Sequence, residues 1–131
     1  AVGVPGGGGV ATAADVALYY QALLHDPAGI WKPEVLTDVT STVRNSFPDY
    51  MGVPANRTRG LVVKGDDERA HIRGMGRTVS PRTFGHFGQS GTFLWVDPDA
   101  GAACIALTDR DFGPWAIEAW PPFTDRVLAA L

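Results

Sequence analysis

The fold is decided by the stretch Phe84-Gly85-His86-Phe87-Gly88-Gln89-Ser90-Gly91 and by the two apolar runs that follow it. The first run covers residues 92–96, and the second covers residues 102–108. The five residues 97–101 between them end in glycine. Two apolar runs around a short loop of this kind are typical of an antiparallel hairpin, so the stretch 84–91 leads directly into a β-sheet.

Upstream of this hairpin, the sequence predicts two helices. Thr12 is a favourable N-cap residue, and Asp15 three places later supplies the acidic partner of a capping box. A second, shorter helix is expected to begin at Pro33, because proline is favoured in the first helical turn. In the first helix, apolar side chains recur at helical spacing, at Val16, Tyr19, Tyr20, Leu23 and Leu24.

The remaining segments complete an α+β pattern. Residues 41–59 and 69–83 show no period and are expected to be loops, whereas residues 61–63 form a short β-type run. The chain of 131 residues therefore predicts one α+β domain, with an antiparallel sheet of three to four strands and flanking helices. A closing helix is expected to place its apolar side chains on one side, at Phe123, Val127, Leu128 and Leu131.

The composition excludes several classes of partner. The formal net charge is −3, and the sequence has no basic stripe of the kind that binds nucleic acid. No apolar stretch reaches the roughly 18 residues of a membrane span. The three histidines are too scattered to indicate a metal site, and we expect neither a metal nor a cofactor. The sequence does not indicate a cellular compartment.

The glycines at the entry to the hairpin have two interpretations. Gly88 and Gly91 allow a ligand or another backbone to approach closely. A backbone N–H left unpaired at such an edge polarises a substrate carbonyl, which is the work of an oxyanion hole. The other interpretation of the same glycines is an ordinary edge strand that accommodates a neighbouring loop.

Ser90 invites a different hypothesis, because residues 88–92 approach the nucleophile elbow Gly-x-Ser-x-Gly of α/β-hydrolases. The first glycine is one place early, however, and Thr92 occupies the last position. The elbow also needs a helix after the serine, whereas Ser90 precedes an expected strand. Ser90 is therefore the least favoured nucleophile hypothesis.

The segment Gly85-His86-Phe87-Gly88, followed by Gly91 and the run 93–98, resembles the third motif of the serine β-lactamase-like superfamily. This superfamily includes penicillin-binding proteins and family VIII-type esterases. The N-terminal stretch Pro5-Gly6-Gly7-Gly8, with the capped helix at 12–17, is similar to a glycine turn and helix of the same family. The resemblance covers nearly the whole chain and implies part of a β-lactamase/transpeptidase-like domain.

The family's nucleophile motif, Ser-x-x-Lys, does not occur in the sequence. The residues three places after the four serines are Arg44, Asp49, Thr83 and Phe93. In this family the nucleophile lies N-terminal to the glycine turn. We therefore expect residues 1–131 to be a C-terminal fragment of such a domain, and we expect the isolated chain to be inactive.

The resemblance also assigns roles on the third motif. His86 matches the Lys or His that lines the active site, and the backbone N–H of Gln89 matches the one that completes the oxyanion hole. Gly88 would keep the strand open to the acyl group. The implied function is acyl-enzyme hydrolysis of an ester, amide or lactam, and histidine in place of lysine favours an esterase or peptidase type over an efficient β-lactamase. The alternative is a non-catalytic interaction module of the same fold.

Assembly follows from the expected truncation. A sheet without its N-terminal strands is expected to expose an unpaired strand edge and apolar side chains. The expected partners are thus a small-molecule acyl substrate in the full-length protein and a second copy of this chain, paired through the exposed edge. The side chains expected on the exposed surface are Phe93, Trp95, Ile105 and Leu107.

Overall fold

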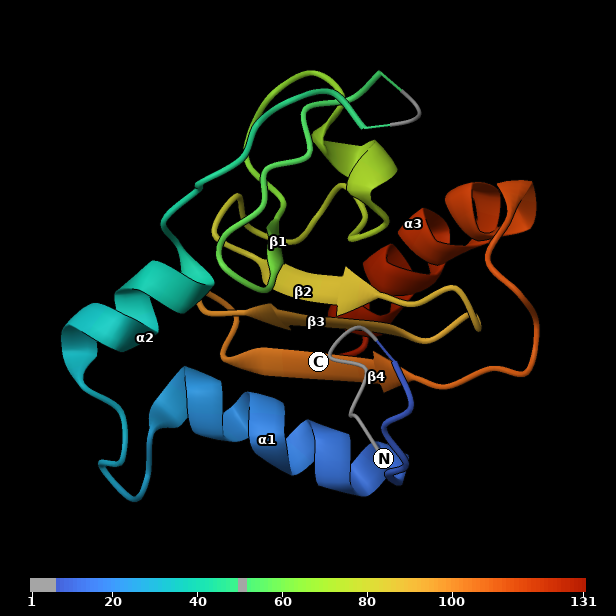
Figure 1. Ribbon diagram of the computed structural model, residues 1–131. Coiled ribbons are helices and arrows are strands. Elements are labelled where there is room, and N and C mark those ends of the chain that lie inside the picture. The colour runs from blue at the N-terminus through green and yellow to red at the C-terminus, as the bar shows by residue number, and fades with distance from the viewer. Residues whose placement is uncertain (1–6, 50–51) are drawn as a thin grey trace.

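The computed structural model describes residues 7–49 and 52–131, and it places an antiparallel sheet between helices (Figure 1). Pro5 and Gly6 of the expected glycine turn lie outside the described residues. The elements in chain order are α1 (Ala13–His25), α2 (Pro33–Thr40), β1 (Val62–Val63), the short 3₁₀ helix η1 (Ala70–Arg73), β2 (Phe84–Phe87), β3 (Phe93–Asp97), β4 (Ala102–Ala106) and α3 (Pro114–Ala129). The α+β prediction is confirmed.

The four strands lie in the sheet in their chain order, β1-β2-β3-β4, and every neighbouring pair is antiparallel. The hairpin predicted from residues 92–108 is confirmed as β3 and β4, with Trp95 opposite Cys104. The strand β2 pairs with β3, so that His86 lies opposite Leu94. The first part of the third motif, up to Phe87, is therefore held in the sheet by β3, and Gly88 to Gly91 form the turn that follows.

One face of the sheet is covered by α1 (Figure 1). The predicted capping box is present, because the Asp15 N–H donates to the Thr12 hydroxyl and the Asp15 carboxylate accepts from the Thr12 N–H. Tyr20 and Leu23 of this helix are buried in one apolar cluster with residues of β1, β2 and β3, and Leu94 belongs to the same cluster. Burial of this face therefore stabilises both the helix and the sheet.

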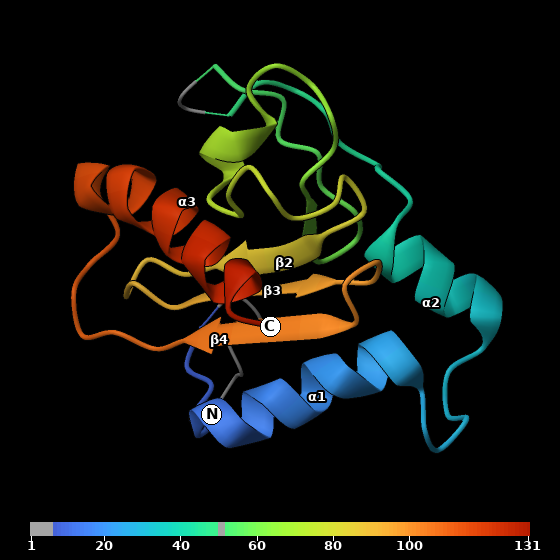
Figure 2. The same cartoon turned by 180° about the vertical axis from the view of Figure 1, so that it is seen from behind.

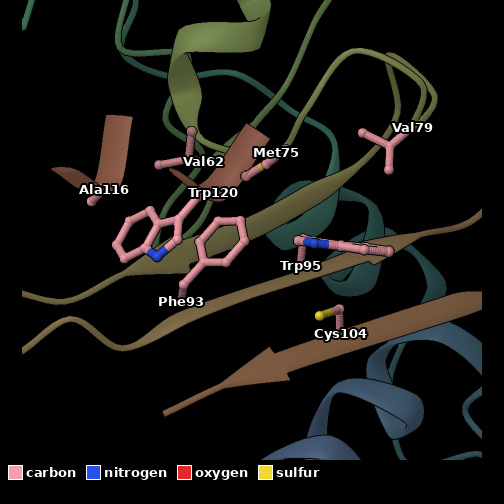
Figure 3. Close-up of a cluster of buried hydrophobic side chains, with 8 residues drawn as sticks. All are labelled: Val62, Met75, Val79, Phe93, Trp95, Cys104, Ala116 and Trp120. Atoms are coloured by element: carbon pink, nitrogen blue, oxygen red, sulfur yellow. The ribbon is translucent and has the colours of Figure 1, made fainter. Parts of the chain in front are cut away.

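The opposite face is covered by α3 (Figure 2). Trp120 stacks on Phe93 with ring centroids 4.6 Å apart, and Figure 3 shows the two rings side by side with Met75 and Trp95 near them. The indole N–H of Trp95 donates to the Thr124 hydroxyl at 3.0 Å, which satisfies a polar group that is otherwise buried.

The structure corrects two expectations about exposure. Phe93 and Trp95 are fully buried rather than exposed, because α3 covers them. The apolar face expected for the closing helix is also partly wrong, since Phe123 is 44% exposed and Leu131 is 82% exposed. The helix begins at Pro114, and its buried side consists of Ala116, Trp120, Pro121 and Thr124. No helix of residues 7–49 and 52–131 has the length and apolar character to span a membrane.

Candidate active site

His86 lies near the end of β2 and is half-buried. Strand alternation places its side chain on the same face as Phe84 and Leu94. Its ring Nδ1 lies 2.6 Å from the carbonyl oxygen of Phe87, and its Nε2 lies 3.3 Å from Nη1 of Arg57. Both ring nitrogens thus have partners from the protein, one on the strand itself and one on the loop before β1.

The surroundings of His86 favour the uncharged imidazole. Burial lowers its pKa below the ordinary value of 6.5, the hydrogen bond to the Phe87 carbonyl acts in the opposite direction, and the Arg57 charge lowers the pKa further. No acidic side chain in the described part of the chain contributes to this balance. His86 is therefore neutral near neutral pH.

The turn after β2 orients the peptide that joins Gly88 to Gln89. The Gly88 N–H donates to the Thr92 carbonyl at 2.8 Å, and the Gly88 carbonyl accepts from the Gly91 N–H at 3.0 Å. The described peptides include no cis bond, and the C=O and N–H of a trans peptide point in opposite directions. With its carbonyl held inside the turn, this peptide directs the Gln89 N–H away from the turn.

The Gln89 N–H donates to no acceptor among residues 7–49 and 52–131. The carbonyl of Gln89 is held at the same time, because it accepts from the Phe112 N–H at 2.7 Å. The residue is exposed, and no acceptor of the described chain occupies its N–H. This geometry meets the requirement for a preorganised donor, since both flanking peptides are fixed while the donor is free.

Gly88 and Gly91 differ in whether their surroundings require glycine. A Cβ on Gly91 would lie 2.0 Å from the carbonyl oxygen of Arg110, and the residue has a positive φ of 76°. Gly91 therefore accommodates a neighbouring loop, as one interpretation of the sequence expected. A Cβ on Gly88 would meet only the Thr92 Cβ at 3.6 Å and the Ser90 hydroxyl at 4.0 Å, which are ordinary contacts. Neither its φ nor these contacts require glycine at position 88.

A hollow of about 300 Å³ lies beside Gln89. Its wall is formed largely by the start of α3 and the residues before it. The lining residues are Gln89, Phe112, Gly113, Pro114 and Ile117. The free backbone donor thus belongs to a residue that borders a largely apolar concave surface, which is the usual combination in small-molecule sites.

Ser90 lies exposed in the turn between β2 and β3. Strand β3 follows it, whereas a nucleophile elbow needs a helix at that place. The ring nitrogens of His86 bond to Phe87 and Arg57, so His86 does not act as a base for Ser90 in this arrangement. The α/β-hydrolase hypothesis is therefore disfavoured by the topology and by the hydrogen bonds.

Comparisons with known proteins assign the chain to a family. The family model for β-lactamase matches residues 1–127. The chain belongs to the β-lactamase family. The crystal structure of a β-lactamase (Mb2281c) from Mycobacterium bovis is similar to it, with a TM-score of 0.73 and 39% sequence identity. The similarity covers 89% of this chain and 43% of that one, so this chain spans less than half of its length. A search of the curated proteins found no match.

The β-lactamase family match and the solved structure confirm the resemblance stated from the sequence. The roles of His86, Gly88 and Gln89 remain predictions. Sequence reasoning missed Arg57, which lies 29 residues before His86 in a loop without a period. It also missed Phe112, whose contact with Gln89 depends on how the chain returns after β4. No local pattern in the sequence connects either residue with the third motif.

Proposed function

We propose that this chain forms the strand side of the active site of a serine hydrolase that works through an acyl-enzyme. The substrate is an ester, amide or lactam. In this proposal the Gln89 N–H is one donor of the oxyanion hole, and Gly88 leaves room for the acyl group. His86 contacts the reacting groups from the same strand. In this proposal the nucleophilic serine is not one of these 131 residues.

The observation that carries this proposal is the free N–H of Gln89. The peptides on both sides of the Gln89 Cα are fixed by hydrogen bonds to their carbonyl groups. Negative charge develops on the carbonyl oxygen during acyl transfer, and a donor that is already oriented stabilises it without reorganisation. An interior strand would pair such an N–H, and a mobile loop would not fix its direction. The turn of residues 88–92 does neither, since it holds the carbonyl of Gly88 and leaves the next N–H free.

Two features favour an ester or a peptide-like substrate over a penicillin. The third motif carries histidine at position 86, as is commoner in esterase and peptidase-like relatives. The hollow beside Gln89 is bordered by Phe112, Pro114 and Ile117, which suit an apolar acyl or alcohol group. We propose that such a group lies there while the carbonyl oxygen accepts from the Gln89 N–H.

A fluorophosphonate probe tests this proposal, because it labels only activated serines. In a longer protein that contains this sequence, we expect labelling of a serine in a Ser-x-x-Lys motif and hydrolysis of short acyl esters. The 131-residue chain alone is expected to show neither. Labelling of Ser90 would contradict the proposal and favour the α/β-hydrolase hypothesis. A longer protein that is neither labelled nor active would favour the non-catalytic interaction module.

A further inference from the structure

The hydrogen bonds of His86 determine where its proton lies. A carbonyl oxygen only accepts, so the bond of 2.6 Å to the Phe87 carbonyl requires a proton on Nδ1. A guanidinium only donates, so the contact of 3.3 Å with Arg57 requires a lone pair on Nε2. Together these partners are compatible with one state of the ring, the neutral imidazole protonated on Nδ1.

The backbone of Arg57 is fixed relative to the sheet. Its N–H donates to the Asn45 carbonyl at 2.8 Å, and its carbonyl accepts from the Arg44 N–H at 2.7 Å. An isolated antiparallel bridge also joins Arg57 to Val62 at the start of β1. The loop thus holds the residue beside β2 through main-chain bonds that do not depend on its side chain.

The charge of Arg57 is not neutralised by an acid. The ion pairs within residues 7–49 and 52–131 involve Arg44, Arg59, Arg73 and Arg82, and none includes Arg57. The side chain is half-buried, so its charge is screened less than that of an exposed arginine. A cation in this position opposes protonation of the neighbouring ring and favours its lone pair.

We propose that Arg57 is a positioning residue, whose guanidinium binds Nε2 of His86 and holds the imidazole as the neutral Nδ1–H tautomer. This inference rests on the proposed function, in which His86 contacts the reacting groups. In this arrangement His86 is neither a proton donor nor a general base, because its Nδ1–H is bound to the Phe87 carbonyl and its Nε2 lone pair accepts from Arg57. The positive charge at this end of β2 belongs to Arg57.

The first test is ¹⁵N NMR of the 131-residue chain, which distinguishes a ring nitrogen that carries hydrogen from one that carries a lone pair. Wild-type His86 is expected to show hydrogen on Nδ1 and a lone pair on Nε2, and to titrate below the ordinary histidine pKa of 6.5. Hydrogen on Nε2, or a charged ring at neutral pH, would overturn the proposal without any variant. Neither outcome depends on catalysis, so the proposed function can fail independently.

The second test compares Arg57→Met, Arg57→Lys and the control Arg59→Met. Arg59 lies two residues away and pairs with Asp38, so its loss removes a nearby charge without touching His86. In Arg57→Met we expect a mixture of tautomers and a rise in the pKa of His86, because the donor and the charge are both absent. Arg57→Lys should partly restore the Nδ1–H tautomer and the lowered pKa of His86. Arg59→Met should leave the tautomer and the pKa of His86 at their wild-type values. Equal shifts in the Arg57→Met and Arg59→Met variants would contradict a specific role for Arg57.

Discussion

The carbonyl oxygen of Gly88 accepts a hydrogen bond from the Gly91 N–H at 3.0 Å, and this single bond decides where the next N–H points. The Gly88 carbonyl and the Gln89 N–H belong to one planar trans peptide. When the turn holds the carbonyl, the N–H is directed outward. The candidate oxyanion donor is therefore a product of the turn geometry, and it does not depend on the Gln89 side chain.

We expect Gly91→Ala to disturb this turn. The new Cβ would lie 2.0 Å from the Arg110 carbonyl oxygen, and the residue has a φ of 76°. The expected loss in the free energy of unfolding is about 2–5 kcal/mol, from the left-handed backbone and the clash together. Gly101→Ala is the matched control, because Gly101 has a φ of 63° but no atom within 4 Å of the added Cβ. Denaturant unfolding should give the control a cost of only about 1–2 kcal/mol.

The stack of Trp120 on Phe93 gives a second prediction. Trp120 is 4% exposed, so Trp120→Ala leaves a large cavity in the cluster between α3 and the sheet. We expect a loss of about 3–5 kcal/mol in the free energy of unfolding. Phe123→Ala on the same helix should cost less than about 1 kcal/mol, because that side chain is 44% exposed. Similar losses for the two variants would show that α3 is not packed in this way.

The pKa of His86 predicts a pH dependence of stability. Its folded-state pKa is lowered below the ordinary value of 6.5, so the unfolded chain binds the proton more readily. The stability that comes from the neutral ring is complete above 6.5 and is lost as the pH falls through the folded-state pKa. Urea unfolding of wild type and His86→Gln at about pH 7.5 and about pH 5 isolates this contribution. Wild type should lose stability relative to the variant at the lower pH, and a constant difference would refute the prediction.

We propose that the chain associates through the outer edge of β4. This strand is at the end of the sheet order, and no strand of the described residues pairs with its outer edge. Leu107, which follows it, is 44% exposed, as expected from the sequence. We expect a homodimer formed through this edge. Sedimentation equilibrium checks it, and a single mass of 13.9 kDa across a tenfold dilution series would exclude the dimer.

The elements predicted from sequence share a local cause. The capped helix at Thr12, the helix at Pro33 and the hairpin of β3 and β4 each depend on residues within a few places of one another. The wrong expectations concern the exposure of side chains that pack against a distant part of the chain. Whether Phe93 is exposed is decided by Trp120, which lies 27 places away in a helix whose start was not predicted.

In the candidate site, too, the residues predicted from the sequence belong to one local motif, whereas the residues that were missed come from distant loops. His86, Gly88 and Gln89 form one short motif, and they could be named from it. The partners that fix them, Arg57 and Phe112, are brought in by loops whose paths no periodicity encodes. Sequence reasoning therefore found the strand that carries the proposed chemistry and missed the residues that orient it.

In the proposed reaction the backbone N–H of Gln89 stabilises the oxyanion, and a pair of variants at position 89 separates this N–H from the side chain. Gln89→Pro removes the N–H, whereas Gln89→Ala keeps it and removes only the side chain. Gly88 precedes the site and tolerates the restriction that proline imposes on its neighbour. The measurement is kcat for ester hydrolysis by a longer, catalytically active protein that contains this sequence. We expect a loss of about 100 to 1000-fold for Gln89→Pro and a value close to wild type for Gln89→Ala. Equal activity of the two variants, with both folded, would contradict a role for the Gln89 N–H in the oxyanion hole.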